Sequence, residues 1–156
     1  GMDIIFVTTA ETDEEAKELL KAQIVNGEAL KKLAELAEAQ GGDGSYVLNP
    51  TKFESAKEII PVIAKEAGYI TYINALEIGV SSMLLGGGRE TMNDIIDSAV
   101  GIVLNKKIED YVQPGDVLAY VHTNGKNTET VLNRVYNAFE FGTDLHKKEL
   151  ILKVIR

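Results

Sequence analysis

The chain has 156 residues, a formal net charge of −8 and an isoelectric point near 4.8. This length fits one domain or a domain with an appendage, which can bury about 70% of its unfolded surface. The acidic balance and the short apolar runs disfavour nucleic-acid and membrane partners, and neither is expected. The absence of cysteine excludes disulfides and thiolate zinc sites, and a cytoplasmic setting is the default.

The first residues allow more than one interpretation. Gly1 before Met2 is typical of a residue left by tag removal, so we exclude it from the fold prediction. Residues 3–8 contain enough β-branched and aromatic side chains for a short strand, but their state stays open. If Met2 is a true start, the gene product is itself short; otherwise the chain is a piece of a longer protein.

Two amphipathic helices are predicted next. Thr12 and Glu15 have the spacing of a capping box, which places the start of the first helix. Gly41-Gly42 can end the second helix in the left-handed conformation. The apolar positions at helical spacing are Ala16, Leu19, Leu20, Ile24, Leu30, Leu33, Ala34, Leu36 and Ala37. We therefore expect an αα-hairpin over residues 2–43.

A change in composition follows the helices. Residues 41–56 are rich in glycine, serine, asparagine and aspartate, so we interpret residues 44–56 as a linker. Residues 57–156 predict an α+β domain with antiparallel strands, and Pro61, which cannot donate to a ladder, predicts an edge strand or a bulge. The expected strands are 59–64, 68–73, 99–105, 116–122 and 148–155.

Two helices are expected among these strands. Asn74 with Glu77 caps the first, and the glycine run 86–88 ends it. Asn127 or Thr128 caps the second, whose apolar face carries Val131, Leu132, Val135 and Phe139.

The loop Gly86-Gly87-Gly88-Arg89 is the first candidate site. Bare glycine amides can approach an anion, and an arginine can clamp it. However, the loop follows a helix C-terminus, where the dipole is negative, and no dinucleotide or P-loop pattern is complete. We favour a helix stop with a flexible turn, and we expect the loop to be among the most mobile parts of the chain.

The other candidates are weaker. Asp94 and Asp97 would share a face on a helix, but a lone carboxylate pair is more typical of a solvated surface. His122 near a strand end and His146 in a polar turn have no nucleophilic serine or cysteine nearby in the sequence. We therefore predict no catalytic residue, no cofactor-binding residue and no metal ligand in this chain.

Two segments carry a family resemblance. The stretch from Gly68 to His122, which reads GYITYINALEIGVSSMLLGGGRETMNDIIDSAVGIVLNKKIEDYVQPGDVLAYVH, resembles the C-terminal domain of pyrimidine-nucleoside phosphorylases and the related thymidine phosphorylases. The segment 26–43, NGEALKKLAELAEAQGGD, resembles the helix pair that precedes this domain. The resemblance implies that residues 2–43 end a central α/β domain and that 57–156 form a hammerhead-like barrel-sandwich domain with inserted helices.

The resemblance also implies an activity. In the complete enzymes, inorganic phosphate attacks the anomeric carbon of a pyrimidine nucleoside and releases uracil or thymine and pentose 1-phosphate. The family's phosphate loop, Thr-Gly-Gly-x-Gly-Asp, does not occur here. We therefore expect phosphate and nucleoside to bind, and the possible homodimer to form, only in a complete enzyme. We expect no cofactor in this chain, and we expect the isolated chain to be inactive. The family's Leu-Gly-Ala-Gly-Arg loop beside the substrate cleft makes Gly86 to Arg89 a candidate domain-closure loop, which Gly87 in place of alanine should loosen.

Two alternatives remain open. Residues 110–118 fit the pattern D-x-V-x-x-G-x-x-L, which with Lys126 in the following turn resembles a biotinyl or lipoyl carrier domain. Glu109 stands where those domains have glycine, and no Met-Lys-Met surrounds the lysine. The other alternative is a non-catalytic regulatory or interaction module that kept the hammerhead fold.

Overall fold

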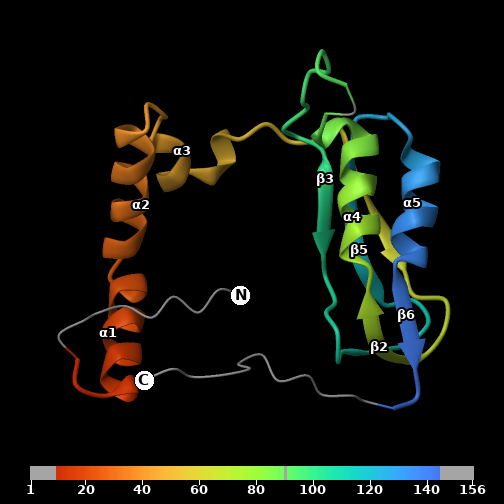
Figure 1. Cartoon of the computed structure of the whole chain (residues 1–156), viewed down its shortest axis with the longest axis horizontal. Coiled ribbons are helices and arrows are strands. Elements are labelled where there is room, and N and C mark those ends of the chain that lie inside the picture. The colour runs from red at the N-terminus through yellow and green to blue at the C-terminus, as the bar shows by residue number, and fades with distance from the viewer. Residues whose placement is uncertain (1–9, 90, 145–156) are drawn as a thin grey trace. The chain divides into compact units, whose positions relative to one another are not determined.

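The computed structural model describes residues 10–89 and 91–144 of the chain. The chain forms two compact units that divide between Phe53 and Glu54, a boundary inside the predicted linker 44–56 (Figure 1). The open segment 3–8, the predicted strand 148–155 and His146 lie outside the described residues.

The helices of the first unit begin and end where local signals place them. They are α1 (Asp13–Val25), α2 (Glu28–Ala39), α3 (Ser45–Leu48) and the 3₁₀ turn η1 (Pro50–Lys52). The Thr12 hydroxyl accepts from the Glu15 amide at 3.1 Å, as in the predicted N-cap. Gly41 has a φ of 82°, and the Gly42 amide donates to the Ala37 carbonyl at 2.9 Å, which ends α2 as predicted.

The predicted linker is partly helical. The Asp43 carboxylate accepts from the Ser45 amide at 2.8 Å, and the Asn49 side chain accepts from the Thr51 amide at 3.3 Å. Asp and Asn side chains start helical turns in this way. The polar residues Asp43 and Asn49, which we interpreted as signs of a linker, therefore also start two short helical turns.

The structure differs from the predicted αα-hairpin. The helices α1 and α2 follow one another end to end (Figure 1), because Asn26 stays in the right-handed helical region and only Gly27 leaves it, with a φ of 81°. One left-handed residue does not reverse the chain. As a result no residue of α1 is buried and α2 buries only Ala34. The large apolar side chains left exposed on the two helices are Leu19, Leu20, Ile24, Val25, Leu30, Leu33 and Leu36.

The second unit confirms the α+β class with antiparallel sheets. One sheet has the strand order β1-β5-β3 and the other β4-β2-β6, and all pairings are antiparallel. The strands are β1 (Glu58–Ile63), β2 (Gly68–Ile73), β3 (Gly101–Leu104), β4 (Tyr111–Val112), β5 (Val117–Thr123) and β6 (Phe139–Gly142). The helical elements are α4 (Ala75–Ser82), the π turn η2 (Met83–Gly87) and α5 (Thr128–Asn137).

The strand at the edge of the first sheet is β1, as Pro61 predicted, and this proline lies opposite Tyr120 of β5. Sequence reasoning missed β4, which has only two residues, and β6. Phe139 was expected on the face of the last helix, but α5 ends before it, and the residue begins β6. Phe139 is still buried, at 5% exposure. The prediction that it packs in the core is therefore confirmed, and the prediction that it is helical is wrong.

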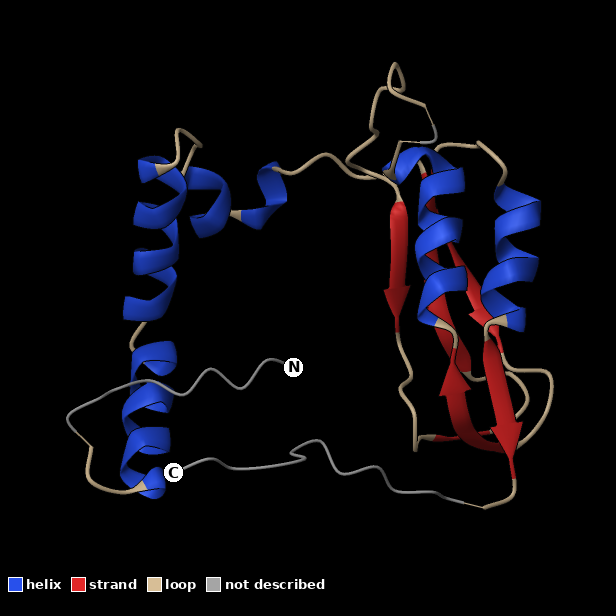
Figure 2. Cartoon of the chain, viewed as in Figure 1, coloured by secondary structure: helices blue, strands red, loops and turns tan. Residues whose placement is uncertain are grey.

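The core of this unit lies between the sheets and the helices α4 and α5. These helices lie side by side (Figure 2), and an ion pair of 2.7 Å between Arg134 and Glu77 joins them. The largest fully buried apolar side chains come from both helical and strand elements and are Ile70, Leu85, Val112, Leu118, Val121, Val131 and Val135.

The start and the end of α4 follow the predicted signals, a capping asparagine and a glycine run. Asn74 caps the helix by accepting from the amides of Leu76 and Glu77, at 3.1 and 3.2 Å. After Ser82 the backbone widens into η2, and Gly86 takes a φ of 108°, which an L side chain rarely adopts.

The neighbouring Gly87 is packed rather than loose. A Cβ atom built on it would lie 3.0 Å from the Ser82 Oγ atom, 3.1 Å from the Ser82 carbonyl and 3.3 Å from the Val100 carbonyl. The expectation that Gly87 loosens the loop is therefore replaced by another role, the close approach of two backbone segments.

This packing predicts that two glycine-to-alanine substitutions change the free energy of unfolding in opposite directions. Gly87→Ala should lower the free energy of unfolding by about 1–3 kcal/mol, because its methyl group meets backbone that cannot rotate away. Gly79→Ala, inside α4 with nothing within 4 Å, should raise it by about 0.5–1 kcal/mol. Urea unfolding followed by circular dichroism measures both. A stabilising Gly87→Ala would contradict the packing role.

Candidate functional site

The candidate site lies at the end of the second unit where α4 finishes. Three segments meet there, namely the candidate closure loop 86–89, the longer loop that runs on to β3, and the turn 124–127 between β5 and α5. The loop before β3 projects beyond the ends of β3 and α4 (Figure 1). Arg89 is exposed, Gly87 and Gly88 are half-buried, and Gly86 is buried, so only the end of the predicted mobile loop faces solvent.

Asp97 connects these segments. Its amide donates to the Gly86 carbonyl at 2.9 Å, and its carboxylate accepts from the Ala99 amide at 3.0 Å and from the Asn124 side-chain amide at 2.7 Å. The residue is half-buried, so it does not belong to the solvated surface that we expected for it. A carboxylate with two donors in fixed positions holds backbone in place.

Asp94 has a different role from Asp97. Its carboxylate accepts from the Thr91 hydroxyl at 2.7 Å and from the Thr91 amide at 2.9 Å, both within the loop. The segment is irregular rather than helical, so the two aspartates do not share a helix face. Among the described residues no group of three potential metal-binding side chains occurs.

Two asparagines of the turn complete the arrangement, and sequence reasoning did not place them in the site. Asn127 was a predicted cap of α5, but its side chain makes no cap hydrogen bond. The Asn124 side-chain carbonyl accepts from the Lys57 amide at 2.8 Å, and the Asn127 side-chain amide donates to the Leu84 carbonyl at 2.9 Å. The string Asn-Gly-Lys-Asn signalled a turn, and asparagine is typical of turns. Nothing in the string indicated the partners, which lie 67 and 43 residues away.

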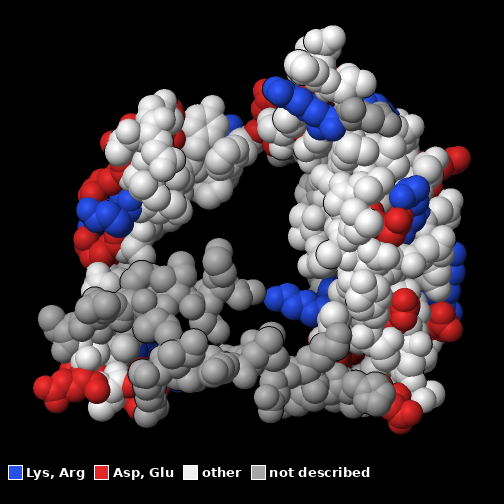
Figure 3. All heavy atoms as spheres, in the orientation of Figure 1, with Lys and Arg blue, Asp and Glu red and all other residues white. Residues whose placement is uncertain are grey.

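The cations of the site are exposed. The Cδ atom of Lys126 would lie 3.9 Å from a Cβ built on Gly86, so this lysine passes over the closure loop. Figure 3 shows basic side chains beside the projecting loop on the visible face of the unit. His122, by contrast, lies inside β5 between Ile59 and Gly101 of the neighbouring strands, one residue before the strand ends.

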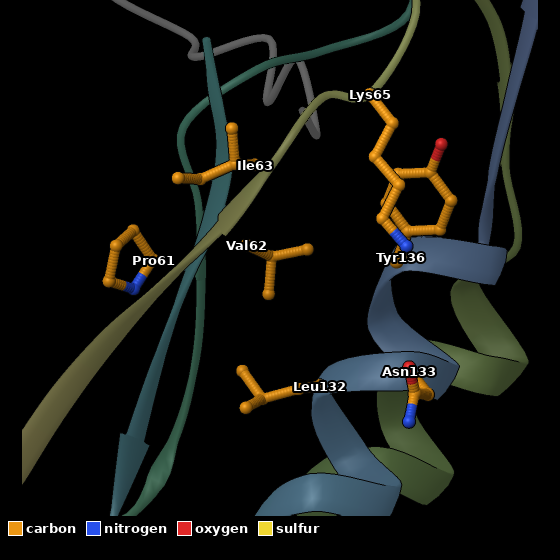
Figure 4. A pocket seen from close by; sticks show the side chains of 7 residues that line it. All are labelled: Pro61, Val62, Ile63, Lys65, Leu132, Asn133 and Tyr136. Carbon is orange, nitrogen blue, oxygen red and sulfur yellow. The ribbon is translucent and has the colours of Figure 1, made fainter. Parts of the chain in front are cut away.

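A groove of about 320 Å³ lies elsewhere in the unit, between β1 and α5 (Figure 4). Its lining is mainly apolar, and the Lys65 ammonium closes one side, 4.2 Å from the centre of the Tyr136 ring. The lining residues are Pro61, Val62, Ile63, Lys65, Leu132, Asn133 and Tyr136. A groove with one cation and no carboxylate can bind an apolar group, but it offers no acid and base pair.

The described part of the chain contains no helix with the length and apolar character needed to cross a membrane.

Comparison with known proteins identifies the domain. Residues 69–142 match the family model of the pyrimidine nucleoside phosphorylase C-terminal domain. Over 152 residues, 97% of the chain, the sequence is 41% identical to a pyrimidine-nucleoside phosphorylase of Staphylococcus epidermidis and 40% identical to that of Bacillus subtilis. The chain spans 35% of the length of each of these relatives. The resemblance to the pyrimidine-nucleoside phosphorylase family seen in the sequence is therefore confirmed, for residues 69–142 by the family model and for 97% of the chain by these relatives.

Proposed function

We propose that this chain supplies the C-terminal part of a pyrimidine-nucleoside phosphorylase. The similarity along 97% of the chain to phosphorylases about three times as long carries this proposal. The complete enzyme would transfer the pentose of uridine-type or thymidine-type nucleosides to inorganic phosphate, giving free base and pentose 1-phosphate. The hammerhead-like description of the fold, a cytoplasmic setting and a homodimer in the complete enzyme belong to the same proposal.

The chemistry assigns this chain a positioning role. Phosphorolysis needs donors that hold phosphate in line with the bond that breaks and a charged clamp on the departing base. The sequence has no Thr-Gly-Gly-x-Gly-Asp loop to hold phosphate, and the Asp97 carboxylate is already occupied by Ala99 and Asn124. We therefore assign closure over the substrate to the loop Gly86 to Arg89 and the reacting contacts to the rest of a complete enzyme.

A second candidate is a non-catalytic interaction module. The exposed leucines of α1 and α2 support it, because exposed apolar side chains gain free energy when another protein part covers them. The same surface fits the phosphorylase proposal, in which the rest of the enzyme would cover it. Activity measurements separate the two candidates.

We predict that Lys126 carries no biotinyl or lipoyl group. In the structure this lysine lies between β5 and α5, so a helix follows it rather than the second strand of a hairpin. Intact-mass measurement after co-expression with biotin and lipoate ligases checks this. An added mass that maps to Lys126 would favour the carrier alternative.

We predict that the isolated chain folds cooperatively but does not phosphorolyse uridine or thymidine. The expected result is no release of free base above the blank, because the phosphate loop and the base clamp are missing. The measurement mixes purified chain, phosphate and nucleoside and compares base release with the Bacillus subtilis relative. Turnover within about three orders of magnitude of that control, free of host contamination, would direct attention to Arg89, Asp94, Asp97 and His122.

A chimera tests the positive half of the proposal. In it, these 156 residues replace the aligned third of the Bacillus subtilis relative. We expect the chimera to release uracil from uridine, whereas the relative truncated before this third should not. A folded chimera without activity, beside an active parent, would favour the interaction module.

A further inference from the structure

The loop between the closure glycines and β3 holds large apolar side chains in solvent. Met92 is 89% exposed and Ile95 is 93% exposed, and Ile96 is 48% exposed. Apolar side chains lose free energy when they leave water, so a loop free to collapse would lay this tip, Met92 to Ile96, on its own domain. Something must therefore hold the tip outward.

The hydrogen bonds at the base of the loop provide that restraint. Asp97 contacts the Gly86 carbonyl through its amide and the Ala99 amide through its carboxylate. The second carboxylate oxygen accepts from Asn124, whose own carbonyl accepts from the Lys57 amide. The base of the loop is thus connected to η2 and to the turn after β5, and through Asn124 to the residue before β1.

We propose that Asp97 is the positioning residue of the closure loop. Its hydrogen bond to Asn124, which we call the latch, holds the base of the loop that follows the closure glycines. The exposed tip of that loop is thereby kept in position for contact with another part of the enzyme. The contact rests on the proposed function, whereas the latch is a property of this chain alone. An experiment without catalysis therefore tests the latch even if the phosphorylase proposal fails.

The two residues differ only in their terminal groups, which allows a reciprocal exchange. In Asp97→Asn, the side-chain oxygen that remains is needed by the Ala99 amide, so two side-chain NH2 groups face each other. In Asn124→Asp, two carboxylates face each other. The double variant restores one donor and one acceptor at the same 2.7 Å contact and leaves the net charge unchanged. Its side-chain oxygens can still accept from Ala99 and Lys57. A double-mutant cycle isolates the coupling of such a pair.

The experiment measures amide exchange by NMR in the full chain. Each single variant should speed exchange of the Ala99 amide by about tenfold or more, and the double variant should return it to within about threefold of the wild-type rate. Asp94→Asn, which removes a charge from the same loop, should leave this amide unchanged. The Leu118 amide in the core reports global unfolding and corrects for it.

A second readout follows the tip itself. Relaxation of the Met92 methyl group by a soluble gadolinium chelate should be strong in the wild type and the double variant and weaker in the single variants, where the tip can collapse. The proposal is overturned if the double variant exchanges as fast as the singles, if Asp94→Asn matches Asp97→Asn, or if Met92 stays equally accessible in all variants. If a single variant unfolds, a folded double variant with wild-type exchange supports the latch, and an unfolded one rejects it.

Discussion

The central position of β5 is the constraint on which the second unit depends. This strand pairs with β1 on one side and β3 on the other, and Ala119, Val121 and Thr123, which alternate along it and share one face, are buried. A one-residue slip in an antiparallel register would turn these side chains away from the core. The register therefore fixes where β5 ends, at Thr123, and with it the place of the Asn124 turn. The candidate site inherits its geometry from this packing.

The sequence predicted the features that local chemistry determines. The caps at Thr12 and Asn74 and the stop at Gly41 depend on neighbours within a few residues, and the edge position of β1 follows from the missing amide of Pro61. The strand state of Phe139 was missed because its burial suits a helix face as well as a strand. The arrangement of α1 and α2 was missed because one turn residue decides it.

In the candidate site, too, local features could be predicted from the sequence and contacts between distant residues could not. The glycine run and its helix stop were visible in the sequence, whereas the role of Asp97 depends on Asn124, which is 27 residues away. Single-sequence patterns indicate which residues can accept hydrogen bonds, and only the fold determines which donors reach them. The Gly87 packing shows the reverse case, in which a glycine that suggested freedom is instead packed closely against Ser82 and Val100. Within residues 86–89, Gly86 is buried and Arg89, at the outer end, is exposed.

These observations connect stability with the proposed role. A domain that closes over a substrate has to keep its contact surface in one shape before the contact forms, because ordering it afterwards would reduce the free energy available for binding. The buried core and the Asp97 hydrogen bonds supply that rigidity, and the exposed Met92 and Ile95 supply apolar surface that gains free energy only when another protein part covers it. Under the proposed function, the chain would bring shape and apolar contact to the complete enzyme, and the charged groups that phosphate transfer requires would come from the rest of that enzyme.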